Sequence, residues 1–265
     1  MLELLSLSDN IRYILTVVCA AFYFLAFGSC LAVKGKHSKL SSVLWGMATA
    51  VNALIVISNW CVNGYMPFVS MYQVLTFLAL TYSLVYVYVS YRFKGSFMKP
   101  YFMLFQGVIM VGVFFMGRTA SVWNFPPALQ SVYFIPHVFS YMISYTLVAV
   151  AALMCVMSFI LKDENKLRHE KAVYHLVITG FPFMVLGMLL GALWANACWG
   201  NFWSWDLKET WSLLTVMTLS VYLHFRRRPN LQKYGKVLVI AAFAFEIITL
   251  FFVGMFDGSS IHAYS

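Results

Sequence analysis

Charged side chains are scarce in this 265-residue chain, and their scarcity excludes a soluble globular domain. Lys, Arg, Asp and Glu together make up only 10% of the residues, whereas soluble domains average about 25%. Hydrophobic residues make up 62%, and the mean hydropathy is +0.79. This composition predicts an all-α, polytopic membrane protein.

Paired cysteine motifs are also missing. The five cysteines include no Cys-x-x-Cys pair, so the chain has no thiol-redox or heme-attachment motif of its own. Cys61 and Cys198 are expected near the same membrane face and can approach one another. The sequence leaves open whether they form a disulfide.

Eight apolar segments are long enough to cross a bilayer, which requires about 20 residues per helix. We place them near 11–33, 41–61, 69–91, 99–117, 133–161, 172–194, 209–225 and 237–256. The first is too long for a cleaved signal peptide and lacks the small-residue cleavage site. A single integral membrane domain over residues 1–265 is therefore expected.

Acidic residues number only nine against 18 Lys and Arg, and most basic residues fall in alternate loops. The loop residues are Lys34, Lys36, Lys39, Arg92, Lys94, Lys99, Lys162, Lys166, Arg168, Lys171, Arg226, Arg227, Arg228, Lys233 and Lys236. Because cytoplasmic loops are enriched in Lys and Arg, this pattern predicts that both termini and residues 195–211 are extracytoplasmic. The net charge of +9 is then an orientation signal with attraction to anionic lipid, and no nucleic acid is expected as a partner.

The most distinctive segment is 199–211, which carries four tryptophans between two apolar segments. They are Trp199, Trp203, Trp205 and Trp211, and Asp206 and Glu209 lie among them. Aromatic residues at membrane interfaces are usually scattered. This density predicts a platform for a large, flat, apolar ligand, and an interfacial anchor is the alternative.

Two histidines are expected on the same outer face as the tryptophan segment. His137 opens the fifth apolar segment, and His262 follows the eighth. Ionisable groups within membranes are functional candidates by default, and neutral imidazoles are good axial ligands for heme iron. The pair predicts a bis-histidine heme site, against the alternative of two unrelated interfacial histidines.

The remaining histidines have weaker signals. His224 lies 18 residues after Asp206, or about 27 Å along a helix, so it cannot ligate the same iron as the outer pair and on its own is typical of an interfacial histidine. His37 and His169 are expected on the solvated surface of basic loops. His175 is expected to face headgroups or another helix.

The order W-G-x-x-W-x-W-D-x-K-E-T-W at 199–211 resembles the tryptophan-rich WWD signature of heme-handling proteins, and is most similar to the CcsA family of cytochrome c biogenesis. Further stretches are similar to the same family. They are 127–131 with His137-Val138, 180–182, 191–196, 222–224 and 261–264. Two positions depart from the family pattern, since Ala263 stands where serine is more common and Gln73 where glutamate is usual.

This resemblance implies a subunit of a membrane holocytochrome c synthase that works with a second membrane protein, CcsB. In it, His137 and His262 would be axial ligands of heme b, and the tryptophan segment with Asp206 would cover that heme. His224 would ligate heme at an inner site together with a residue of the partner. The implied location is a bacterial or plastid-type inner membrane, with the active site on its outer face.

The implied chemistry is thioether formation, in which thiols of a Cys-x-x-Cys-His motif in apocytochrome c add to the heme vinyl groups. Asp206 and Glu209 are candidates for orienting the site, and capping of a helix is an equal alternative. Two other functions stay open: a heme exporter or chaperone of the CcmC type, and a non-heme membrane transporter. Glu246, a carboxylate in the middle of the last apolar segment, is expected to pair with another helix or to be protonated.

Overall fold

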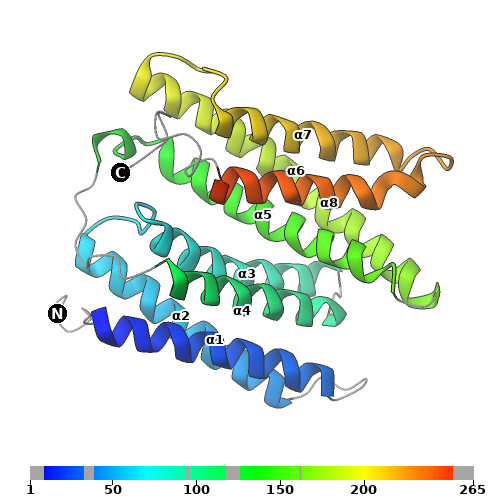
Figure 1. Ribbon diagram of the computed structural model, residues 1–265, viewed down its shortest axis with the longest axis horizontal. Coiled ribbons are helices and arrows are strands. Elements are labelled where there is room, and N and C mark those ends of the chain that lie inside the picture. The colour runs from blue at the N-terminus through cyan, green and yellow to red at the C-terminus, as the bar shows by residue number, and fades with distance from the viewer. Residues whose placement is uncertain (1–8, 33–38, 94–95, 117–125, 161–162, 253–265) are drawn as a thin grey trace. The chain divides into compact units, whose positions relative to one another are not determined.

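The computed structural model describes residues 9–32, 39–93, 96–116, 126–160 and 163–252 (Figure 1). These ranges form eight α-helices and no β-strand, which confirms the predicted all-α class. The helices are α1 (Asp9–Ala32), α2 (Lys39–Asn63), α3 (Met71–Phe93), α4 (Lys99–Phe115), α5 (Phe134–Met157), α6 (Asp163–Trp199), α7 (Leu207–Phe225) and α8 (Gly235–Ile247). Two candidate residues, His37 and His262, lie outside the described residues.

The chain divides into two compact units, and the first contains α1 to α4. Each of its helices packs against two others, so the four helices close into a ring. Gln106 on α4 is fully buried there. Its amide donates to the Ser83 hydroxyl at 2.6 Å and accepts from the Trp45 indole at 2.9 Å. A buried amide is tolerated in an apolar bundle because its hydrogen bonds are satisfied within the protein.

The second unit contains α5 to α8, which close into a similar ring: α5 packs on α6 and α8, and α7 packs on the same two helices. Its longest element, α6, has 37 residues with Pro182 inside it. At 1.5 Å per residue it is about 55 Å long, which exceeds a hydrocarbon core of about 30 Å. The ends of α6 therefore extend beyond one membrane thickness or the helix is tilted.

Six helical stretches of the described residues are long and apolar enough to span a membrane. Five lie in α1, α2, α3, α5 and α6, and the sixth is Gln232–Phe251, in which the 13-residue α8 is extended by short helical turns at both ends. The shorter α4 has 17 residues, and α7 has 19 with charged residues in its first turn. A polytopic membrane protein is thus confirmed. That α4 and α7 also cross the membrane, which would make eight membrane-spanning helices, stays a prediction. The single-domain organisation over 1–265 also stays a prediction.

One expectation about the inner loops is wrong. Residues 163–171 were expected in a loop, but they form the first turns of α6. As a result His169, expected on the solvated surface, is 6% exposed. The reason is that α6 extends beyond its apolar core, so its polar first turns are helical and one of their faces packs against the protein.

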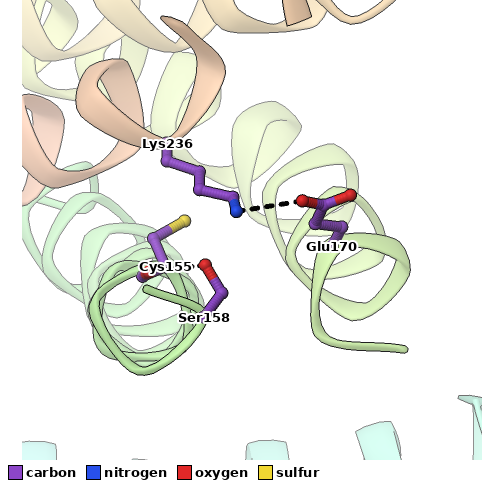
Figure 2. Close-up of polar contacts among 4 residues, drawn as sticks. All are labelled: Cys155, Ser158, Glu170 and Lys236. Atoms are coloured by element: carbon purple, nitrogen blue, oxygen red, sulfur yellow. Dashed lines mark hydrogen bonds and ion pairs between the residues drawn. The ribbon is translucent and has the colours of Figure 1, made fainter. Parts of the chain in front are cut away.

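The charged first turns of α6 and α8 meet at one end of the second unit (Figure 2). Lys236 in the first turn of α8 forms an ion pair with Glu170 of α6 at 2.9 Å. Cys155 and Ser158 from the end of α5 lie beside this pair. His137 and the tryptophan segment belong to the opposite ends of the same helices, so the unit separates a basic end from an aromatic end.

Candidate functional site

His137 lies in the first turn of α5 and is held in a defined orientation. Its Nδ1 lies 2.8 Å from the backbone carbonyl oxygen of Gly187 on α6. A carbonyl only accepts, so Nδ1 carries the proton in this contact and the lone pair of the neutral ring is on Nε2. Metal-binding histidines are commonly oriented in this way, with one ring nitrogen donating to a backbone carbonyl.

Glycines of α6 make the space that His137 and its neighbours occupy. A Cβ added at Gly191 would lie 2.6 Å from His137 Cε1 and 2.7 Å from Nδ1. A Cβ added at Gly187 would lie 3.1 Å from Cγ of Tyr141. Small residues four apart let membrane helices approach closely. The sequence reasoning did not connect these glycines with His137, although their Gly-x-x-x-Gly spacing is a recognisable signal.

Aromatic rings connect His137 with the beginning of the tryptophan segment. The ring centroids of Trp194 and His137 are 5.6 Å apart, and their ring planes are inclined at 32°. Trp194 is 2% exposed. Trp199 lies 5.0 Å beyond Trp194, and Tyr141 meets His137 edge-on at 4.9 Å. Trp194 lies in the family-like stretch 191–196 just before the signature, and its contacts with His137 and Trp199 make it a further candidate site residue.

The tryptophan segment divides among three elements. Trp199 is the last residue of α6. The next residue, Gly200, has φ +79° and lies outside the helix. Trp203 and Trp205 lie in the irregular stretch that follows, with their rings 5.8 Å apart and nearly perpendicular. Trp211 lies on α7 and packs against Phe245 of α8 at 5.3 Å.

Two tryptophans of the irregular stretch are in unusual environments. Trp205 has φ +60° and is 69% exposed. This left-handed conformation is rare for a bulky residue and is found most often at functional sites. The indole Nε1 of Trp203 is buried without a hydrogen-bond partner among the described residues. An exposed indole ring and an unsatisfied buried donor are both features that a bound ligand can explain.

Asp206 and Glu209 begin α7 as a capping box. Asp206 Oδ1 accepts from the backbone N–H of Glu209 at 2.8 Å. Glu209 Oε2 accepts in return from the backbone N–H of Asp206 at 3.3 Å and from that of Ser204 at 2.8 Å. The capping alternative for these two carboxylates is confirmed, and a role of Asp206 towards a substrate stays a prediction.

His224 is exposed in the last turn of α7, and its Nδ1 lies 2.8 Å from the carbonyl oxygen of Ser220. Because α7 is continuous, the estimate of about 27 Å from Asp206 applies to this helix. His224 thus belongs to the basic end of the second unit, where the Arg226 guanidinium lies 5.1 Å from the centre of the Tyr174 ring. His175 is also exposed.

Other candidate residues have simple structural roles. Gln73 closes a cap at the start of α3, where its Oε1 accepts from the backbone N–H groups of Val69 and Ser70 at 3.0 and 3.4 Å. Glutamine is therefore compatible with a position where glutamate is usual. Cys61 and Cys198 are not joined by a disulfide. The described residues contain no cluster of three or more His, Cys, Asp or Glu side chains able to hold a metal ion.

Together, the described helices and this site define a polytopic helical membrane protein with an oriented histidine beside an aromatic segment. The family described as Cytochrome C assembly protein matches residues 68–259, which is most of the chain. The chain therefore belongs to this family and has a role in cytochrome c biogenesis.

Similar proteins agree with the assignment and share one description, Cytochrome c biogenesis protein CcsA. The protein of Chlamydomonas reinhardtii is 30% identical over 89% of this chain and 71% of its own length. That of Trieres chinensis is 26% identical over 98% of this chain and 96% of its own length. That of Nymphaea alba is 26% identical over 79% of this chain and 80% of its own length. The chain is accordingly of the CcsA type.

Proposed function

We propose that the chain is the heme-handling subunit of a membrane holocytochrome c synthase. The observation that carries the proposal is the seat of His137, in which the Gly187 carbonyl fixes Nδ1 and Gly191 leaves room for the ring. This arrangement leaves the lone pair on Nε2, the nitrogen that would ligate iron. Its aromatic neighbour Trp194 joins it to the tryptophan segment.

At the outer face, His137 and His262 would hold heme b through their imidazole nitrogens. Trp199, Trp203, Trp205 and Trp211 contribute aromatic surface, with Asp206 fixing the start of α7 beside them. The exposed ring of Trp205 and the unsatisfied indole N–H of Trp203 support a large ligand at this position. The residues present thus fit a flat macrocycle with polar edges.

The reaction is addition of the two thiols of a Cys-x-x-Cys-His motif in apocytochrome c across the two heme vinyl groups. In each addition one S–C bond forms, the vinyl double bond becomes single, and the thiol hydrogen moves to the other vinyl carbon. No leaving group or net oxidation is involved. The chain contributes mainly by positioning, because orientation of two reactants supplies several kcal/mol of a barrier. His137 or His262 would give up the heme to the histidine of the apocytochrome c motif.

His224 serves a separate inner site, where heme is received before it reaches the outer face. Its place at the basic end, with Arg226, Arg227 and Arg228 next to it in sequence, supports attraction of heme propionates. One histidine of this chain is an incomplete ligand set, so the second ligand comes from a CcsB-type partner. The membrane is a bacterial or plastid-type inner membrane, with the tryptophan segment on the outer face.

Co-expression of the chain with CcsB and an apocytochrome c tests this proposal. Heme-stained cytochrome c should form with the wild-type chain and should fall strongly with His137→Ala, while the variant is still inserted in the membrane. A matched control is His175→Ala, which removes an exposed histidine of the same unit and should leave the output unchanged. Heme export or chaperoning alone would predict bound heme without any increase in covalent cytochrome c, and that result would refute the synthase.

A further inference from the structure

Glu246 occupies a position in α8 where an apolar residue is expected. The buried residues of α8 are Gly235, Val239, Ala242 and Glu246. They recur at the three- and four-residue spacing of one helix face, and this face packs against α5 and α7. Glu246 is 2% exposed. Its carboxyl group is therefore directed into the helix unit and away from lipid and water.

Neither carboxyl oxygen of Glu246 has a hydrogen-bond partner among the described residues. Lys236, which forms an ion pair with Glu170 of α6, lies at the other end of α8. An ionised carboxylate that is buried without a partner is strongly disfavoured, and such a group takes up a proton instead. A protonated carboxyl is neutral and becomes a hydrogen-bond donor as well as an acceptor.

Among the described residues, no charged group acts on Glu246. From α5, Tyr145 is near enough to interact with it electrostatically. From α7, the buried face presents Ser212 and Thr215. The charged residues at the start of α7 are engaged elsewhere, since Lys208 interacts with Asp206 and Glu209 closes the cap of the helix. A proton is thus the cation that this site accepts, with Tyr145 as a polar residue that interacts with it electrostatically.

The backbone changes directly after Glu246. Helix α8 ends at Ile247 and continues as a π-helical turn from Ile248 to Phe252. Within this turn the Thr249 hydroxyl donates to the carbonyl oxygen of Phe245 at 2.8 Å. Such turns are rare and occur frequently at functional sites. The neighbouring Phe245 contacts Trp211, so the carboxyl lies next to a residue that packs on the tryptophan segment.

We propose that Glu246 is a proton-binding site within the membrane, with Tyr145 as a nearby polar residue, and that binding and release of this proton are part of the working cycle of the chain. The site lies beside the helix that carries Trp211, so its charge state acts on the aromatic end of the unit. The protonation is a property of Glu246 itself and does not depend on the proposed heme site.

Infrared spectroscopy of the purified full-length chain tests the protonation. The difference spectrum of wild type minus Glu246→Gln should contain the carbonyl band of a protonated carboxylic acid, and this band should shift in heavy water. Tyr145→Phe should move the band by removing a hydroxyl that interacts electrostatically with the carboxyl group, and Glu246→Asp should move it without abolishing it. The matched control Glu170→Gln, which removes the paired carboxylate of Figure 2, should leave it unchanged. A carboxylate signal in place of the carbonyl band would overturn the proposal.

A second measurement tests release of the proton. Glutamine has the shape of a protonated glutamate and cannot lose a proton, so Glu246→Gln should insert normally yet lower cytochrome c output, and Glu246→Asp should retain part of it. Unchanged output with Glu246→Gln would refute a working role, even if the infrared band were present. The infrared arm needs no heme, so its failure is distinguishable from failure of the proposed synthase.

Discussion

Gly191 of α6 lies directly against the imidazole ring of His137 on α5. A single added carbon at Gly191 would approach Cε1 of this ring to 2.6 Å, a distance that real Cβ atoms essentially never show. The ring cannot retreat freely, because its Nδ1 is hydrogen-bonded to the Gly187 carbonyl. The position of His137 is thus set by two backbone features of the neighbouring helix.

Gly191→Ala should therefore displace the imidazole or break its hydrogen bond to Gly187. Loss of such an orienting contact typically weakens metal binding about 10–100-fold, so bound heme should fall although every proposed ligand is still present. The control is Gly28→Ala, where an added Cβ meets nothing within 4 Å. Heme titration of both variants measures the effect. Equal heme binding would show that the orientation of His137 by α6 does not affect heme affinity.

The two possible roles of Asp206 can be separated by substitution. Asn is as good a helix cap as Asp, whereas Ala is not, and loss of a cap typically costs about 1 kcal/mol of stability. Asp206→Ala should lower the melting temperature, and Asp206→Asn should not. If the charge of Asp206 also orients the substrate, Asp206→Asn will lower cytochrome c output at unchanged stability. An output equal to wild type would restrict Asp206 to capping.

His224→Ala should reduce the heme that reaches the outer site when CcsB is present. The outer ligands are intact in this variant, so added imidazole should not restore the heme, in contrast to its effect on variants of the outer histidines. Heme content and cytochrome c output measure both effects. Normal cytochrome c output with the partner present would show that His224 is an interfacial histidine without a role in heme uptake.

Membrane orientation can be measured with reporter fusions. Fusions after residues 36, 95, 161 and 230 should report the cytoplasm, because the basic residues concentrate around these points. A fusion at residue 265 should report the outer side. The third point precedes α6, which begins at Asp163, so the reporter does not interrupt a helix. A cytoplasmic C-terminus would contradict both the orientation and an outer site containing His262.

The sequence predicted the helices well because apolar length and charged boundaries are local properties. The eight apolar segments correspond to α1–α8, and the distance from Asp206 to His224 follows from the rise of one helix. The contacts between helices could not be predicted from the sequence, because they join residues that are far apart in the chain. The seat of His137 depends on Gly187 and Gly191, about 50 residues further along the chain, and burial of His169 depends on how far α6 continues past its apolar core.

The arrangement of the candidate site residues was predicted only in part, and their role stays a prediction. The tryptophan segment was expected as one aromatic platform, whereas Trp199 and Trp211 end on different helices and contact Trp194 and Phe245. This division arises because Gly200 ends α6 and Asp206 begins α7 within the segment. For Glu246, the sequence predicts either pairing with another helix or protonation, and the lack of a hydrogen-bond partner among the described residues favours the protonated form.

The absorption spectrum of the purified chain, with and without His137→Gly and added imidazole, tests the central claim most directly. A heme held by His137 and His262 should give a Soret band and the α and β bands of bis-imidazole iron. His137→Gly should lose bound heme or change its reduction potential, and imidazole should partly restore the wild-type spectrum by replacing the missing ligand. A His137→Gly chain whose heme content, spectrum and response to imidazole all match wild type would contradict the account.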